Sequence, residues 1–166
     1  AMSALTVEDF SLTDFASASP RYGFYADGTG IQRSINIKRC SIGLQTTSAS
    51  QYGIALLSNP GAASAAEKST IEGCDVSARS NAIRILQRYV DIRSTRVTNQ
   101  VAGSVVGTND AIVITNPDVT LDGVEVYSSY GNGLYIPYSA SSVAGAIVRV
   151  RNSIFFGSGN LSNSSR

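Results

Sequence analysis

Hydrophobic and polar positions alternate in six short segments of this chain, and the six segments share one template. The template is apolar-x-apolar-x-x-small/apolar-x-apolar, and Ser69 is the one polar residue in its first position. The segments are LTVEDFSL (5–12), INIKRCSI (35–42), STIEGCDV (69–76), VDIRSTRV (90–97), VTLDGVEV (119–126) and VRVRNSIF (148–155). Alternation over so short a run is typical of a β-strand with one buried face, not of a helix.

The third template position gives the length of each repeat. Successive residues there are 30, 34, 21, 29 and 29 positions apart: Val7, Ile37, Ile71, Ile92, Leu121 and Val150. Periods of roughly 20–50 residues indicate stacked units, none of which can bury its apolar face alone. We therefore expect these six side chains to form one inward column.

A second motif follows the template in five of the repeats. A small residue precedes apolar-x-apolar in YGFYAD (22–27), YGIALL (52–57), NAIRIL (81–86), DAIVIT (110–115) and NGLYIP (132–137). At least two short strands per repeat, with Gly- or Asn-rich corners and no helix, predict a parallel β-solenoid. Each strand would then pair in register with its equivalent about 4.8 Å away.

On these two motifs the chain resembles the right-handed parallel β-helix superfamily, which includes pectate lyases and bacteriophage tailspikes, and it looks most like a tailspike or tail-fibre domain. The resemblance covers Leu5 to Phe155. It implies an all-β, single-stranded, right-handed parallel β-helix of about six coils over residues 4–156. We interpret residues 1–3 as a tag remnant and leader, and the Ser/Asn-rich residues 157–166 as a tail that leads to a missing segment.

The charge of the chain is low and balanced. Its 166 residues include 13 Lys and Arg and 12 Asp and Glu, for a net charge of +1, and 43% are hydrophobic. This balance offers no attraction to nucleic acid or to an acidic membrane. No run approaches the ~18 apolar residues of a membrane span, so we expect no nucleic-acid partner and no membrane insertion.

The two cysteines occupy the same template position in consecutive repeats. We expect Cys40 and Cys74 to be buried, unlinked neighbours. A disulfide stays open, since stacked Cα atoms fall within the ~4.4–6.8 Å that it allows, although parallel Cβ directions fit its dihedral poorly. Two thiols without any histidine predict no metal site, and nothing in the sequence indicates a cofactor.

Two outward columns of the template alternate in charge. The first column is Glu8, Lys38, Glu72, Arg93, Asp122 and Arg151. The second column is Ser11, Ser41, Asp75, Arg96, Glu125 and Ile154. Opposite charges on neighbouring strands stabilise a sheet, whereas like charges destabilise it. The alternation therefore supports the register, and it predicts that this outward face is exposed to solvent and has a structural role.

The outward positions of the second motif are unusually apolar. They include Ala55, Leu57, Val113, Tyr135 and Pro137. Apolar residues on both faces of a strand mean that both faces are covered, either by insertions or by another subunit. The insertions are rich in Ser, Ala and Gly, which favours a subunit interface, and the likeness to tailspikes implies a homotrimer.

Two acidic pairs are the candidates for catalysis. Asp91 and Asp122 would lie about 8 Å apart, and Asp75 and Glu125 about 9–10 Å apart, near the spacing of an inverting glycosidase. An arginine beside each pair would favour the charged carboxylates and work against a general acid. A calcium-dependent lyase needs clustered carboxylates, and a base interrupts every acidic column.

Binding of a saccharide requires less than catalysis, namely aromatic faces beside polar groups. Tyr127 and Tyr130, next to a Ser/Gly corner, are the candidates, whereas Tyr25 and Tyr135 fit an interface, where aromatics are enriched. The resemblance implies an extracellular virion component that recognises a bacterial surface polysaccharide. A polysaccharide lyase or hydrolase is the alternative, and a structural spacer of a fibre is a third possibility.

Overall fold

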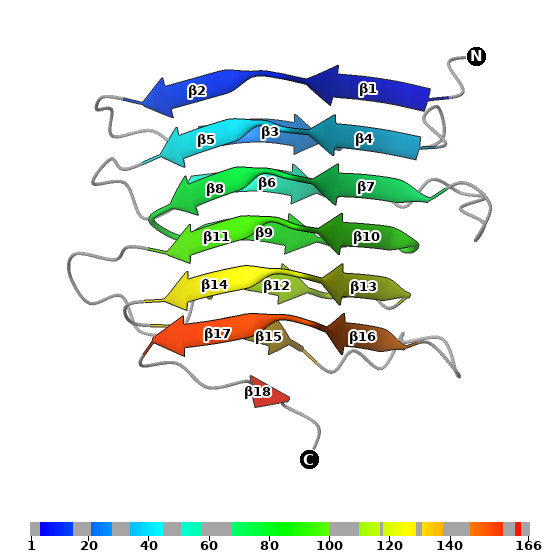
Figure 1. Ribbon diagram of the computed structural model, residues 1–166, viewed down its shortest axis with the longest axis vertical. Helices are drawn as coiled ribbons and strands as arrows, with labels where there is room; N and C mark the ends of the chain where they lie inside the picture. The colour runs from blue at the N-terminus through cyan, green and yellow to red at the C-terminus, as the bar shows by residue number, and fades with distance from the viewer. Residues whose placement is uncertain are drawn as a thin grey trace.

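The computed structural model describes residues 4–14, 21–27, 34–44, 51–57, 68–99, 110–116, 118–128, 131–137, 147–157 and 162–163 (Figure 1). These residues form β-strands and short connections, with no helix among them. The described part of the chain accordingly contains no helix that could span a membrane.

The strands form three six-stranded sheets, and every sheet takes one strand from each repeat (Figure 1). The first sheet contains β1 (Ala4–Glu8), β4 (Ser34–Lys38), β7 (Ser69–Glu72), β10 (Val90–Arg93), β13 (Val119–Asp122) and β16 (Val148–Arg151). The second contains β2 (Ser11–Asp14), β5 (Ser41–Leu44), β8 (Asp75–Ala78), β11 (Arg96–Asn99), β14 (Glu125–Ser128) and β17 (Ile154–Gly157). The third contains β3 (Arg21–Ala26), β6 (Gln51–Leu56), β9 (Asn81–Ile85), β12 (Ile112–Ile114), β15 (Leu134–Ile136) and β18 (Ser162–Asn163).

All strand pairs in these sheets are parallel, and their register confirms the predicted inward column. Val7 pairs with Ile37, Ile37 with Ile71, Ile71 with Ile92, Ile92 with Leu121, and Leu121 with Val150. The chain is therefore all-β with parallel strands, an arrangement compatible with a β-solenoid. Its core is the space between the three sheets, filled mainly by Ile, Val and Leu.

The eight-residue template contains two strands, so each full repeat has three strands, one more than the two motifs account for. The strands are separated by a two-residue bend whose first residue has positive φ in all six repeats: Asp9, Arg39, Gly73, Ser94, Gly123 and Asn152. The two consecutive x positions of the template mark this bend, because they shift the inward-outward alternation by one residue. A left-handed backbone at this position turns the chain from the first sheet to the second.

The second residue of the bend faces the core, and it includes both cysteines. Cys40 and Cys74 are buried free thiols, as predicted. The backbone N–H of Asp75 donates to the carbonyl of Cys40 (2.9 Å), which continues the ladder through the bend. Thr95, above Cys74, is also buried, and its hydroxyl donates to the carbonyl of Arg93 (2.8 Å).

Ser69, the polar exception in the template, is fully buried and hydrogen-bonded on two sides. Its hydroxyl oxygen accepts from the backbone N–H of Ile35 (3.0 Å) and from Nε2 of Gln87 (2.7 Å). Gln87 thus points inward, and its neighbour Leu86 is half-buried. A polar residue is tolerated at this inward position because two buried N–H groups donate to its hydroxyl oxygen.

The glycines that open the second motif in the first two repeats lie against side chains of the second sheet. A Cβ atom added to Gly53 would fall 2.4 Å from Cγ1 of Val76 and 2.6 Å from the carbonyl oxygen of Ala82. A larger side chain would therefore clash both with the second sheet at Val76 and with the next strand of its own sheet at Ala82.

The third sheet continues into the stretch that the sequence assigned to a tail. In β18, Ser162 pairs with Tyr135 and Asn163 with Ile136. Gly157 is likewise the last residue of β17. Residues 1–3 lie outside the described part of the chain.

Candidate functional site

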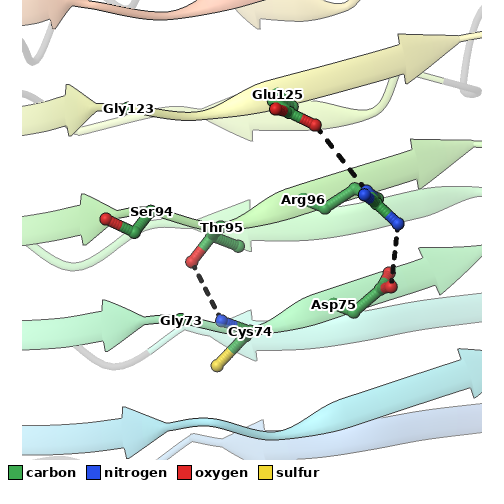
Figure 2. A pocket seen from close by; sticks show the side chains of 8 residues that line it. All are labelled: Gly73, Cys74, Asp75, Ser94, Thr95, Arg96, Gly123 and Glu125. Carbon is green, nitrogen blue, oxygen red and sulfur yellow. Dashed lines mark hydrogen bonds and ion pairs between the residues drawn. The ribbon is translucent and has the colours of Figure 1, made fainter.

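An open depression of about 470 Å³ follows the bends between the first and second sheets (Figure 2). It is lined by Gly73, Cys74, Asp75, Ser94, Thr95, Arg96, Gly123 and Glu125. Because three consecutive bends and the strands after them supply these residues, the depression runs along the stack. It contains the predicted acidic pair Asp75 and Glu125.

Arg96 lies between the two carboxylates of this pair (Figure 2). Its Nη1 is 3.6 Å from Oδ2 of Asp75, and its Nε is 3.7 Å from Oε2 of Glu125. In-register pairing of β8, β11 and β14 places the three residues in one column, as the charge alternation predicts. The guanidinium occupies the space that a glycosidic oxygen and a water would need between two catalytic carboxyls. The three side chains therefore form a charge ladder, that is, a column of alternating charges on neighbouring strands, and not a catalytic pair.

The second acidic pair is also divided by an arginine. Asp91 is buried, although it is an outward position of its strand, and its Oδ2 lies 2.7 Å from Nη2 of Arg93 and 3.4 Å from Nζ of Lys68. Asp122 pairs in register with Arg93, and its Oδ1 accepts from Nδ2 of Asn152 (2.9 Å). The two carboxylates share Arg93 as a neighbour, and each has its own partner.

Tyr127 belongs to an exposed aromatic pair on the outer face of the second sheet. Its ring is nearly parallel to that of Phe156, at 13° and with 5.1 Å between centroids. The two residues pair in register between β14 and β17, and they are 41% and 50% exposed. The sequence predicts Tyr127 as a saccharide contact but does not single out Phe156. The missed signal is positional, since both residues follow their template by one position.

Tyr130, the other predicted saccharide contact, lies outside the described residues. The corner beside Tyr127 is partly described, and there the hydroxyl of Ser128 donates to the carbonyl of Gly131 (3.0 Å). Ser128 is buried, so the polar side chain beside the exposed aromatic pair is Thr98, which lies in register with Tyr127.

The predicted interface positions lie on the outer face of the third sheet, with unequal exposure. Ala55 is fully buried within the single chain, in register between Tyr25 and Arg84, and it has no surface to offer a partner. The other four positions are half-buried: Leu57, Val113, Tyr135 and Pro137. Val113 and Tyr135 pair in register, so they are neighbours on this face.

Potential metal ligands do not gather in the described part of the chain. No group of three or more His, Cys, Asp or Glu side chains is found there. The acidic residues of the sites above are instead partnered by Arg and Lys, or by Asn152 at Asp122.

No protein-family model matches this chain, and neither a curated protein nor a solved structure matches it significantly. The likeness to parallel β-helices therefore rests on the sequence repeat and on the sheet topology described above.

Proposed function

We propose that this chain is a right-handed parallel β-helix of six coils from a bacteriophage tailspike-like protein, and that it binds a bacterial surface polysaccharide. The observation that carries the proposal is the exposed pair of Tyr127 and Phe156 on the outer face of a parallel sheet. Exposed aromatic side chains beside polar groups are typical of a binding surface, because a soluble protein rarely exposes such area without a use.

Binding without cleavage is favoured over the two enzymatic alternatives. A general acid and its partner carboxylate need a clear space in which the scissile bond and a water can sit. Arg96 fills that space between Asp75 and Glu125, and Arg93 is the neighbour of both Asp91 and Asp122. The structure therefore supports a polysaccharide hydrolase or lyase less well than a binding protein. A structural spacer of a fibre is the third candidate function.

The assembly that goes with this function is a homotrimer on the outside of a virion. Three copies would lie side by side and cover the half-buried apolar residues in the later repeats of the third sheet, namely Val113, Tyr135 and Pro137. Apolar side chains on the outer face of a strand support a subunit contact. The extracellular location follows from the tailspike likeness, since surface polysaccharides lie outside the host cell.

The experiment measures binding and chain cleavage on the same glycans. Capsular and lipopolysaccharide oligosaccharides are titrated into the protein by calorimetry, and new reducing ends are counted after prolonged incubation. We expect binding without cleavage, weakened at least 10-fold by Tyr127→Ala and by Phe156→Ala. Ile154→Ala is the matched control, because it removes an apolar side chain that is equally exposed (51%) but not aromatic.

Each alternative has its own result. New reducing ends that are lost in Asp75→Asn or Asp91→Asn would establish an enzyme. Absence of binding to every glycan tested would leave the structural spacer. An effect of Ile154→Ala as large as that of Tyr127→Ala would show that the aromatic rings have no specific role.

A further inference from the structure

Three tyrosines and an arginine form a continuous row on the outer face of the third sheet, in the first three repeats. The rings of Tyr25 and Tyr22 lie 4.3 Å apart between centroids at 55°, and those of Tyr22 and Tyr52 lie 5.3 Å apart and nearly parallel at 9°. The Arg84 guanidinium lies over the Tyr52 ring, 5.4 Å from its centroid. We call these four residues the tyrosine–arginine row.

The register of the sheet builds this row. Tyr22 pairs with Tyr52 between β3 and β6, so their rings stack along the axis. Tyr25 pairs with Ala55, and Ala55 pairs with Arg84 on β9. The alanine between Tyr25 and Arg84 leaves room for both long side chains, which explains why the outward position at Ala55 is small and fully buried.

Arg84 differs from four other arginines of the chain because no carboxylate among the described residues pairs with it. Arg39, Arg88, Arg93 and Arg96 each have an acidic partner within 4.0 Å. Arg84 instead donates from Nη1 to the Tyr52 hydroxyl (3.0 Å), and its buried Nε has no hydrogen-bond partner. A partly desolvated guanidinium without a counter-charge favours an anion in its neighbourhood.

The other end of the row offers hydrogen-bond acceptors beside exposed rings. Tyr22 and Tyr25 are 40% and 45% exposed. The Tyr25 hydroxyl donates to Oδ2 of Asp27 (2.8 Å), and this hydrogen bond raises the pKa of Tyr25 above its ordinary value. The remaining lone pairs of the Asp27 carboxylate are available to hydroxyl donors.

The row therefore presents an acceptor, aromatic rings and a cation in sequence along the axis. Asp27 and Tyr25 belong to the first repeat and Arg84 to the third, so the two ends are separated by two strand spacings, about 9–10 Å. This separation keeps the Asp27 carboxylate away from an anion at Arg84. It also suits a ligand that is both hydroxylated and acidic.

We propose that the tyrosine–arginine row binds an acidic sugar residue of a polysaccharide, with the sugar carboxylate on the Arg84 guanidinium. The sugar ring contacts Tyr22 and Tyr25, and sugar hydroxyls donate to Asp27. This proposal rests on the proposed glycan-binding function and names the chemical class of the glycan. A carboxylate matches the planar fork of a guanidinium, which Tyr52 already holds in place through its ring and hydroxyl.

The test uses oligosaccharides of galacturonic, glucuronic and mannuronic acid, each beside its carboxyl-reduced, neutral form. Calorimetry with the full chain is expected to show binding to at least one acidic oligosaccharide, at least 10-fold tighter than to its neutral form. Arg84→Gln should remove that preference. Arg84→Lys should keep the preference at lower affinity, because it retains the charge without the fork.

Two further variants separate the row from general electrostatics and from folding. Tyr52→Phe removes the hydroxyl that holds Arg84 and keeps the ring, so a fall of a few-fold in affinity is expected. Arg96→Gln removes an equal charge from the ladder on the second sheet and should leave the preference for the acidic oligosaccharide unchanged. Circular dichroism of every variant verifies the fold, and Arg84→Lys carries the test if Arg84→Gln is unfolded.

The outcomes distinguish this proposal from the one on which it rests. Equal affinity for acidic and neutral forms, or an acid preference unchanged in Arg84→Gln, would overturn the role of Arg84. Binding that is weakened by Tyr127→Ala and not by variants of the row would also overturn the role of Arg84, but it would support the general glycan-binding function. No binding to any acidic or neutral glycan would overturn both.

Discussion

The bend residue of each repeat is the position where single side chains are under the most backbone constraint. Its φ is positive in all six repeats, and glycine occupies it only in the third and fifth, as Gly73 and Gly123. The remaining four positions hold Asp9, Arg39, Ser94 and Asn152. Glycine adopts this conformation readily, whereas a side chain costs about 1–2 kcal/mol there.

Replacing Ser94 by glycine should therefore stabilise the protein. We expect Ser94→Gly to raise the free energy of unfolding by about 0.5–1 kcal/mol, since relief of strain exceeds the added entropy of the unfolded chain. Gly123→Ala should lower it by about 1 kcal/mol for the same reason. Urea unfolding followed by circular dichroism measures both changes.

Thr98→Gly serves as the control for this comparison, because Thr98 lies within β11 and has ordinary strand geometry. Glycine there should destabilise by about 0.5–1 kcal/mol. A lower urea midpoint for Ser94→Gly than for the unchanged protein would show that the bend carries no relievable strain.

At the scale of single residues, periodicity predicts inward positions well and outward burial poorly. The inward column and the buried, free cysteines follow from which positions repeat, and both are confirmed. Asp91 and Ala55 are outward by periodicity, yet both are buried. Their exposure depends on side chains from neighbouring repeats and connections, which no local pattern specifies.

At the scale of elements, hydrogen bonds between repeats replace apolar contact at one inward position. Ser69 at the start of β7 joins the N–H of Ile35 in β4 to Gln87, which follows β9. The second and third repeats are therefore linked through one hydroxyl. The other polar atom of the Gln87 side chain, Oε1, is buried and has no hydrogen-bond partner among the described residues.

Removal of the Ser69 hydroxyl should lower the free energy of unfolding by more than the net contribution of its two hydrogen bonds. We expect Ser69→Ala to lower the free energy of unfolding by about 2 kcal/mol or more, because it leaves the Ile35 N–H and the Gln87 amide buried without partners. Gln87→Leu should cost less than about 1 kcal/mol, since it also removes the unsatisfied Oε1.

A double-mutant cycle decides whether the two side chains act together. Adding Gln87→Leu to Ser69→Ala should recover part of the loss, which gives a coupling of about 0.5–3 kcal/mol in urea unfolding. Additive effects of the two substitutions would mean that the hydrogen bond between Ser69 and Gln87 does not stabilise the fold.

The number of elements per repeat shows where the sequence was incompletely interpreted. Alternation predicts one strand over each eight-residue template, whereas the structure has two, because the bend shifts the alternation by only one residue. The charge columns, which depend only on register, were placed correctly on both sides of the bend. Periodicity does not predict the tyrosine–arginine row, because Tyr52 and Arg84 lie on adjacent strands out of register and meet only through the direction of the arginine side chain.

At the scale of the whole molecule, the apolar positions on the third sheet bear on assembly. Val113 is half-buried and lies in register between Arg84 and Tyr135. If the later repeats of this face meet another copy, a charge at Val113 would be buried without a partner there. The fold would survive, because the side chain is outside the core between the sheets.

The proposed trimer can be tested through this residue. We expect the unchanged chain to sediment as a trimer at high concentration and Val113→Glu to sediment as a monomer with an unchanged circular dichroism spectrum. Thr98→Glu, at a half-buried outward position of the second sheet, should assemble like the unchanged chain. A monomer over the full concentration range would contradict the predicted interface.

The architecture of the whole molecule was more predictable than its activity. A repeat constrains which residues stack, so all-β parallel strands followed from the spacing of the templates. Activity depends on which outward residues meet across strands and on what binds them. The separation that the repeat predicts for Asp75 and Glu125 fits a pair of catalytic carboxyls. Only the structure, in which Arg96 lies between them, shows that they belong to a charge ladder.

The bend between the first two sheets has a consequence for molecular length. It contains two residues in all six repeats, whereas the other two connections of a repeat vary widely in length. A unit cut from one bend to the next could therefore be removed or duplicated with every column kept in phase, for a change of about 4.8 Å. Charge sets a stricter rule, since loss of the unit that contributes Ser41 and Glu72 would bring Lys38 next to Arg93. The permitted increment of this stack is thus two units, about 9.6 Å, and elongation by an odd number would put like charges side by side.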